Sequence, residues 1–233
     1  MITERYDEVK RRIAAACERV GRDPNEVTLV AVSKTKPEED IMDLYRYGVR
    51  DFGENYIQEL RTKHDDLPKD IRWHMIGHLQ RNKVKYIADY VEMIHAVDTP
   101  ELVATIEKEG TKHNRIIPVL IEVNVAGEES KFGVKPEDCE AFAATFAQYS
   151  HVSLQGLMTS APFVENPEDN RAVFRELKQL TVDINRKNID NVDMRVLSMG
   201  MTNDFEVAVE EGSTMVRVGT AIFGARNYNT STQ

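Results

Sequence analysis

The sequence predicts one closed (β/α)8 barrel, a TIM barrel, with an additional N-terminal helix. Three observations support this prediction: eight short β-branched apolar segments follow one another along the 233 residues, most gaps between them have helical period, and no Pro/Gly/Ser-rich linker divides the chain. Strands that alternate with helices form parallel sheets through right-handed crossovers. The open doubly wound sheet is disfavoured because no GxGxxG motif follows the first strand.

The elements can be assigned in chain order. Residues 1–20, MITERYDEVKRRIAAACERV, form the additional amphipathic helix, and their charges from the fourth residue onward are unlike a signal peptide. Apolar stretches with strand composition then recur at short intervals. The eight expected strands start at Val27, Val49, Ile71, Glu92, Ile116, Val152, Met194 and Ser213.

The helices between these strands have recognisable ends. Residues Pro37 to Tyr47 place a proline at N1 and acidic residues in the first turn, and Gly48 ends the helix. Thr99 is expected to cap a helix that Gly110 closes. We therefore interpret residues 1–233 as one domain, with a flexible tail from about residue 227. Helices with a similar proline-acid start are expected after Lys135 and Asn166.

Composition argues against several classes of protein. The net charge is −9 and the 30 lysine and arginine residues are scattered, which disfavours nucleic-acid binding. The longest apolar segment, from Ile116, is broken by Pro118 and Glu122 and is too short to cross a bilayer. Cys17 and Cys139 lack CxxC spacing and are expected to be buried reduced thiols. A cytoplasmic location is expected.

The first strand ends in a lysine, within LVAVSKTKP. Barrels build their sites at the carboxyl ends of the strands, and the alternation of a strand puts Val30 and Val32 on the face of Lys34. Inside the barrel mouth, apolar neighbours would lower the pKa of the amine and prepare it to form a Schiff base. A lysine that leaves the strand and enters water is the alternative.

The loops after the last two strands, SMGMTND and VGTAIFGAR, lie where barrels often bind phosphate. Ser198 offers a hydroxyl, Gly200 permits close backbone approach, and Gly219 and Thr220 supply amides and a second hydroxyl. The alternative is that the glycine and serine residues of these loops only form turns. Two neighbouring methionines, Met199 and Met201, are expected to pack in the core.

Arg217 lies inside the last strand, on the face opposite Val216 and Val218. A guanidinium inside a barrel needs an acceptor. An acidic partner or a ring nitrogen or carboxylate of a ligand would serve. A lysine, two phosphate-type loops and an interior arginine together suggest an aldehyde that carries a phosphate, pyridoxal 5′-phosphate (PLP). The acidic candidates are Glu54, Asp98 and Glu122.

Motifs spread over nearly the whole chain closely resemble the pyridoxal phosphate homeostasis protein family: AVSKTKP, FGENYIQE, WHMIGHLQRNK, IHAVDT, GLMTSAP, LSMGMTNDFEVAV and VRVGTAIFGAR. The family is a single-domain barrel similar to the N-terminal domain of alanine racemases. The resemblance implies that Lys34 forms an internal aldimine with PLP and that Arg217 faces the pyridine nitrogen. It implies phosphate contacts from Ser198, Gly219 and Thr220, and pocket lining by Asn55, His78 and Met158.

The function implied is a monomeric protein that holds, buffers and delivers PLP to PLP-dependent apoenzymes, without an established reaction. A fold-type-III PLP enzyme, either a racemase or a decarboxylase, is the alternative, and a lysine aldolase without cofactor is a third that Arg217 disfavours. Lys131, in AGEESKFG, is a candidate for cofactor transfer, although an ordinary exposed loop lysine is the favoured interpretation. No metal is expected, because His74 and His78 fall on a strand and its turn.

Overall fold

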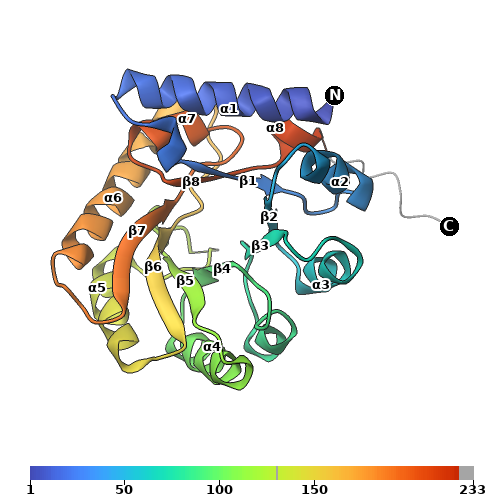
Figure 1. Cartoon of the computed structure of the whole chain (residues 1–233). Coiled ribbons are helices and arrows are strands. Elements are labelled where there is room, and N and C mark those ends of the chain that lie inside the picture. Colours follow the sequence, from blue (N-terminus) through green and yellow to red (C-terminus); the bar gives the residue numbers. More distant parts are fainter. Residues whose placement is uncertain (130, 226–233) are drawn as a thin grey trace.

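The computed structural model describes residues 1–129 and 131–225, so the tail expected from residue 227 lies outside the described residues. Eight parallel strands form a closed barrel in chain order (Figure 1). The last strand closes it by pairing with the first, with Arg217 opposite Val30. The strands are β1 Thr28–Val32, β2 Asp51–Glu54, β3 Arg72–Met75, β4 Met93–Val97, β5 Ile117–Glu122, β6 Val152–Met158, β7 Val192–Ser198 and β8 Met215–Val218. All eight predicted strands are confirmed.

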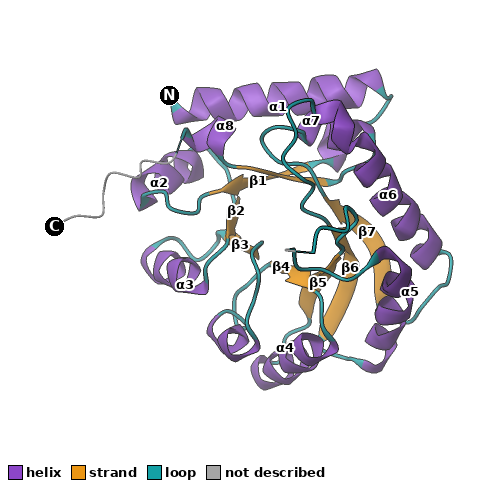
Figure 2. Ribbon diagram, turned by 180° about the vertical axis from the view of Figure 1, so that it is seen from behind, coloured by secondary structure: helices purple, strands orange, loops and turns teal. Residues whose placement is uncertain are grey.

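Helices surround the strands as an outer layer (Figures 1 and 2). The additional helix α1 lies across α7 and α8, on the outside of the barrel (Figure 1). The α-helices are α1 Ile2–Arg19, α2 Glu38–Arg46, α3 Ile57–Asp66, α4 Pro100–His113, α5 Pro136–Ala144, α6 Arg171–Asn185, α7 Phe205–Glu210 and α8 Thr220–Phe223. The short 3-10 segments are η1 Pro24–Glu26, η2 Arg81–Tyr86, η3 Thr145–Gln148 and η4 Pro167–Asn170.

Two helix boundaries differ from the sequence-based prediction. Pro37 is the N-cap of α2 and lies one position before the predicted N1. Gly110 does not close α4, which continues to His113 and ends at the left-handed Asn114. Gly110 is needed for packing instead, since a Cβ there would lie 2.8 Å from the carbonyl oxygen of His151. A glycine selected for close packing looks the same in a sequence as one that terminates a helix.

The apolar interior has two layers. A large outer core lies between strands and helices and includes the fully buried Trp73 and Phe174. A small inner core fills part of the barrel. Its buried members are Val30, Met93, Ala96, Leu120, Met158 and Met215. The two faces of each strand therefore have different surroundings, and polar residues on inward faces meet one another inside the barrel.

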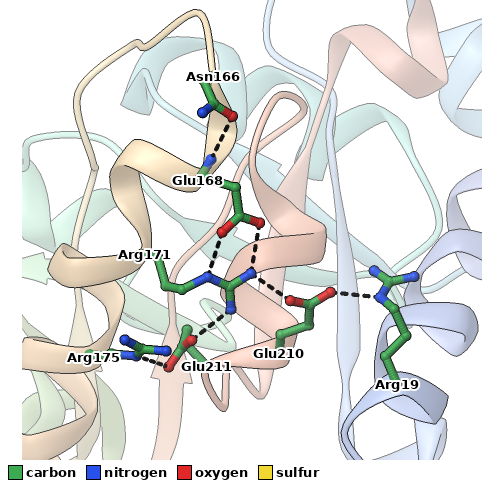
Figure 3. Close-up of polar contacts among 7 residues, drawn as sticks. All are labelled: Arg19, Asn166, Glu168, Arg171, Arg175, Glu210 and Glu211. Carbon is green, nitrogen blue, oxygen red and sulfur yellow. Dashed lines mark hydrogen bonds and ion pairs between the residues drawn. The ribbon is translucent and has the colours of Figure 1, made fainter.

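A network of ion pairs joins α1, α6 and α7 on the surface (Figure 3). Arg171 lies at its centre and donates to Glu168 at 2.6 Å, to Glu211 at 2.6 Å and to Glu210 at 2.7 Å. Glu210 also accepts from Arg19 of α1 at 2.7 Å. The three carboxylates raise the pKa of Arg171 above its ordinary value. This network fastens the additional helix to the helices of the last barrel units.

We expect Arg171→Ala to lower the free energy of unfolding by about 1–2 kcal/mol, because networks of charges contribute more than isolated surface pairs. Urea denaturation would measure the change, and 0.5 M NaCl should reduce it because salt screens the network. The matched control is Arg186→Ala, whose exposed side chain makes a single looser pair with Asp183 at 3.6 Å. Equal stability of Arg171→Ala and the wild type would contradict a structural role for the network.

Candidate functional site

A cavity of about 670 Å³ opens at the carboxyl ends of the strands. Five of the predicted site residues line it together, from three separate parts of the chain: Lys34, Asn55, Arg217, Gly219 and Thr220. Lys34 and the pair Gly219 and Thr220 follow strands β1 and β8, which are hydrogen-bonded neighbours in the closed barrel. Residues nearly 190 positions apart in sequence therefore meet at one site.

The position of Lys34 follows from the alternation of β1. Val30 points into the inner core and Val32 lines the cavity, whereas Ala31 packs in the outer core. Lys34 continues the inward face and is partly buried at the wall of the cavity. The next residue, Thr35, turns the chain with a positive φ of 62°. The lysine thus lies between a strand and a sharp turn, both of which restrict its backbone.

A buried ion pair supports this turn from the other face of β1. Glu54 is fully buried, and its carboxylate accepts from the hydroxyl of Ser33 at 2.6 Å and from Nζ of Lys63 at 2.7 Å. Lys63, on α3, also donates to the carbonyl oxygen of Ser33 at 2.8 Å. Burial raises the pKa of Glu54, and the charge of Lys63 opposes this shift. Glu54 therefore faces α3, and it is not the interior partner of Arg217 that we considered.

Arg217 is 4% exposed and reaches the cavity from inside the barrel. Its Nη1 donates to the hydroxyl of Ser198 at 2.6 Å and its Nη2 to the carbonyl oxygen of Thr159 at 3.0 Å. Within residues 1–129 and 131–225, it forms no ion pair with an acid. Burial lowers the pKa of Arg217 to about 10, and the charges of Glu122 and Asp204 oppose the shift. The guanidinium is therefore cationic at neutral pH.

Three other predicted residues occupy places that the sequence could not specify. Ser198 is fully buried, and its hydroxyl contacts Arg217 and Nδ1 of His95. Met158 is a buried member of the inner core. His78 is exposed, stacks on Phe132 with ring centroids 3.8 Å apart, and lines a neighbouring cavity of about 510 Å³ that shares Asn55 with the first.

The loop after β7 contributes in a different way from the prediction. Gly200 has a φ of +96°, and a Cβ there would lie 2.6 Å from Cβ of Ala208. The glycine is needed so that the loop can pack on α7. Met199 is buried as expected, but the core prediction for Met201 is wrong, because its side chain is 37% exposed and lines the cavity. The next residue, Thr202, lines it as well.

Several residues of the cavity were missed by sequence reasoning. Ile76 extends the inward face that includes His74 of β3, and Ser160, Pro162 and Phe163 belong to the loop after β6. Phe163 is 88% exposed. A large aromatic residue in a loop after a barrel strand was the available signal, since it lies where barrels carry their sites.

A smaller cavity of about 200 Å³ adjoins the first through Ser160 and contains Glu122 and Lys131. Lys131 pairs with Glu128 and donates to the carbonyl oxygen of Ser160 at 3.3 Å. Its side chain is only 33% exposed, so it differs from the ordinary exposed loop lysine that the sequence favoured. Burial, and then the nearby charge of Asp98, raises the pKa of Glu122 to about 7.

The raised pKa of Glu122 gives a pH prediction. Between its usual value of 4.5 and about 7 the folded state binds more protons at this group than the unfolded state, so its contribution to stability falls as pH rises. Glu122→Gln should therefore match the wild type near pH 4.5 and exceed its free energy of unfolding by roughly 1–2 kcal/mol at pH 8. Urea titrations at both pH values would test this, with Glu176→Gln on the exposed face of α6 as control.

In the part of the chain that the structure describes, no group of three or more His, Cys, Asp or Glu side chains could hold a metal ion. None of the helices described is long and apolar enough to cross a membrane. Cys17 and Cys139 are both free and buried.

The fold and the cavity define a class of protein: barrels with a lysine at the end of the first strand and a buried arginine on the last. Residues 5–227 match the family model described as alanine racemase, N-terminal domain. A pyridoxal phosphate homeostasis protein from Aquifex aeolicus is 46% identical over 97% of this chain and 98% of its own length. The chain belongs to the pyridoxal phosphate homeostasis protein family.

Solved structures agree with this assignment. A protein of unknown function from Bifidobacterium adolescentis superposes with a TM-score of 0.90 and 37% identity, covering 95% of this chain and 94% of that one. PipY of Synechococcus elongatus, solved with PLP bound, superposes with a TM-score of 0.83 and 30% identity, covering 96% of this chain and 100% of PipY.

Proposed function

We propose that this protein binds pyridoxal 5′-phosphate at the cavity of β1 and β8 and acts in PLP homeostasis by holding, buffering and delivering it. One observation carries the proposal: Lys34 and the buried, cationic Arg217 line the same cavity as Gly219 and Thr220. An amine for an aldehyde, a guanidinium for a ring nitrogen and small residues for a phosphate thus share one site. PipY, at 30% identity, is described with PLP bound.

The residues present fit such a ligand. The volume of about 670 Å³ is in the range of pockets for small cofactors. A guanidinium has five N–H groups, and two of those of Arg217 donate to Ser198 and Thr159, which leaves donors for a ligand. At Gly219, a Cβ would lie 3.2 Å from the carbonyl oxygen of Val32, so the backbone of this corner packs closely on the end of β1.

Each side chain has a distinct part in the proposal. When bound, PLP would supply an aldehyde that condenses with the amine of Lys34. Arg217 would orient the ring by donating to its nitrogen, and Gly219 and Thr220 would hold the phosphate with amide and hydroxyl donors. Asn55 would line the ring side of the cavity. Ser198 would act through Arg217 and not on the phosphate, because its hydroxyl lies in hydrogen-bond contact with that guanidinium.

A holding function is favoured over a racemase or decarboxylase by two features. Arg217 keeps its proton, and a ring nitrogen that only accepts from it is a weak electron sink. Among the described residues that line the cavity there is no tyrosine or histidine to move a proton at a substrate carbon. We also propose that the protein is monomeric and cytoplasmic and that it passes PLP to apoenzymes. The free buried cysteines support a location in a reducing compartment.

The proposal is tested by adding PLP to the purified protein, reducing with borohydride and mapping peptides by mass. We expect one reduced pyridoxyl group, on the peptide that contains Lys34. Transfer of unreduced cofactor to an apoenzyme should then restore that enzyme's activity. Protein that takes up no PLP would contradict the proposal. Robust turnover of an L- or D-amino acid would favour the alternative of a PLP-dependent racemase or decarboxylase.

A further inference from the structure

Polar side chains on the inward faces of five strands form a continuous chain of contacts across the barrel interior. Nε2 of His74 lies 3.1 Å from Oδ1 of Asp51, and Nδ1 of His74 lies 2.9 Å from Nε2 of His95. Nδ1 of His95 then lies 3.0 Å from the hydroxyl of Ser198, which accepts from Arg217 at 2.6 Å. The chain therefore runs from a carboxylate at the start of β2 to the guanidinium at the cavity.

The chemistry of its ends gives this chain a direction. Asp51 is paired with Arg72 through two hydrogen bonds, which together with His74 lower the pKa of its carboxyl to about 2 despite burial, so it can only accept. Arg217 can only donate. Burial is the main cause that lowers the pKa of His95 well below its usual range, so His95 is neutral.

With one proton on each imidazole ring, these end conditions leave one consistent set of hydrogen-bond directions. Nε2 of His74 donates to Asp51, so its Nδ1 must accept from Nε2–H of His95. Nδ1 of His95 then accepts from the hydroxyl of Ser198, whose oxygen accepts from Arg217. Each of these groups donates toward Asp51, and each hydrogen bond fixes the orientation of the next.

We propose that Asp51, His74, His95 and Ser198 are positioning residues that form a directional relay, anchored at the Asp51 carboxylate, which holds the guanidinium of Arg217 toward the cavity. The relay explains how a buried guanidinium is held without a direct ion pair. Its effect on PLP rests on the proposed function, but the proton arrangement exists in the free protein and can be tested there.

Asp51→Asn would remove the carboxylate that anchors the relay while keeping the shape of the side chain. Its amide can accept from His74 or donate to it, so both directions of the relay become available. In the reversed arrangement Nδ1 of His95 would donate to Ser198. A change at Asp51 should therefore alter the tautomer of His95, although no hydrogen bond joins the two residues directly. A network that only supports packing would not produce this effect.

The test measures imidazole nitrogens by long-range ¹H–¹⁵N NMR in the protein without PLP. We expect His95 to be protonated at Nε2 in the wild type and to become a mixture of tautomers in Asp51→Asn. The matched control is Asp70→Asn, which removes an ion pair in which Nε of Arg50 lies 2.8 Å from Oδ2 of Asp70. This control should leave the tautomer of His95 unchanged. Protonation of His95 at Nδ1 in the wild type, or an unchanged tautomer in a folded Asp51→Asn protein, would overturn the relay.

A second variant keeps the proposal testable if Asp51→Asn does not fold. Ser198→Ala removes the hydroxyl that joins His95 to Arg217 but leaves the Asp51 carboxylate that anchors the relay. His95 should therefore remain protonated at Nε2. In the PLP arm, Ser198→Ala should raise the Kd for PLP about tenfold, as expected for losing one hydrogen bond to a charged group. An altered tautomer in Ser198→Ala, or an unchanged Kd in a variant that retains PLP labelling at Lys34, counts against the relay. A wild type that binds no PLP contradicts the proposed function alone.

Discussion

Lys34→Ala is expected to abolish the borohydride-stable attachment of PLP completely. The variant keeps the barrel, because Lys34 is only partly buried and its backbone turn depends on Thr35 and Ser33. Arg217, Gly219 and Thr220 should still bind PLP non-covalently. Loss of the covalent link should raise the Kd at least about a hundredfold, which corresponds to ~2.7 kcal/mol.

The measurements are the absorbance of the bound cofactor, equilibrium dialysis and peptide mapping after reduction. Lys36→Ala is the matched control, since this lysine lies two residues away and its Nζ donates to the carbonyl oxygens of Gly224 and Ala225, each at 3.0 Å. It should retain labelling at Lys34. If Lys34→Ala protein still carried one reduced pyridoxyl group per chain, the assignment of Lys34 would be wrong.

Lys63→Met is expected to give the largest loss of stability, about 3–5 kcal/mol. The replacement leaves the Glu54 carboxylate fully buried without its cation, and among residues 1–129 and 131–225 the hydroxyl of Ser33 is the donor that remains. An isolated buried charge is far more costly than a buried pair. Because the same lysine holds the carbonyl of Ser33, the turn that carries Lys34 should loosen as well.

Urea denaturation at pH 7 measures this change, and the double variant Lys63→Met/Glu54→Gln supplies the internal test. Removing both charges should restore more than half of the lost free energy, since a neutral amide costs less to bury. The control is Lys112→Met, whose exposed lysine lies 3.7 Å from Glu109. A loss below about 1 kcal/mol in Lys63→Met would show that Glu54 is solvated or protonated in the folded protein.

Much of the barrel could be predicted from the order of apolar segments. Period-two alternation correctly placed Val30 on one face of β1 with Val32, and Val216 on the face of β8 opposite Arg217. Closure of eight strands makes the first and last neighbours, so a site shared by Lys34 and the loop after β8 could be expected. Helix ends were harder to predict from the sequence. Gly110 is required because the backbone of another element lies close to it, and such a requirement leaves no pattern in the neighbouring residues.

The particulars of the site depended on contacts between distant residues. The phosphate role implied for Ser198 and the close-approach role suggested for Gly200 were each inferred from a motif. In the structure the hydroxyl of Ser198 accepts from Arg217, and Gly200 packs on α7. His95, within IHAVDT, attracted no functional prediction, although it joins His74 and Ser198 in the relay. A short motif does not reveal which side chain lies across the barrel from it.

Side chains alternate along a strand whatever its neighbours are, so the sequence already showed which residues of a strand share a face. The sequence also placed Lys34 on the face of Val30 and Val32, and Arg217 on the face opposite Val216 and Val218. The line of contacts from Asp51 through His74 and His95 to Ser198 became apparent in the folded barrel alone. Their contacts depend on the relative register of five strands, and register is a property of the closed sheet that no single strand encodes.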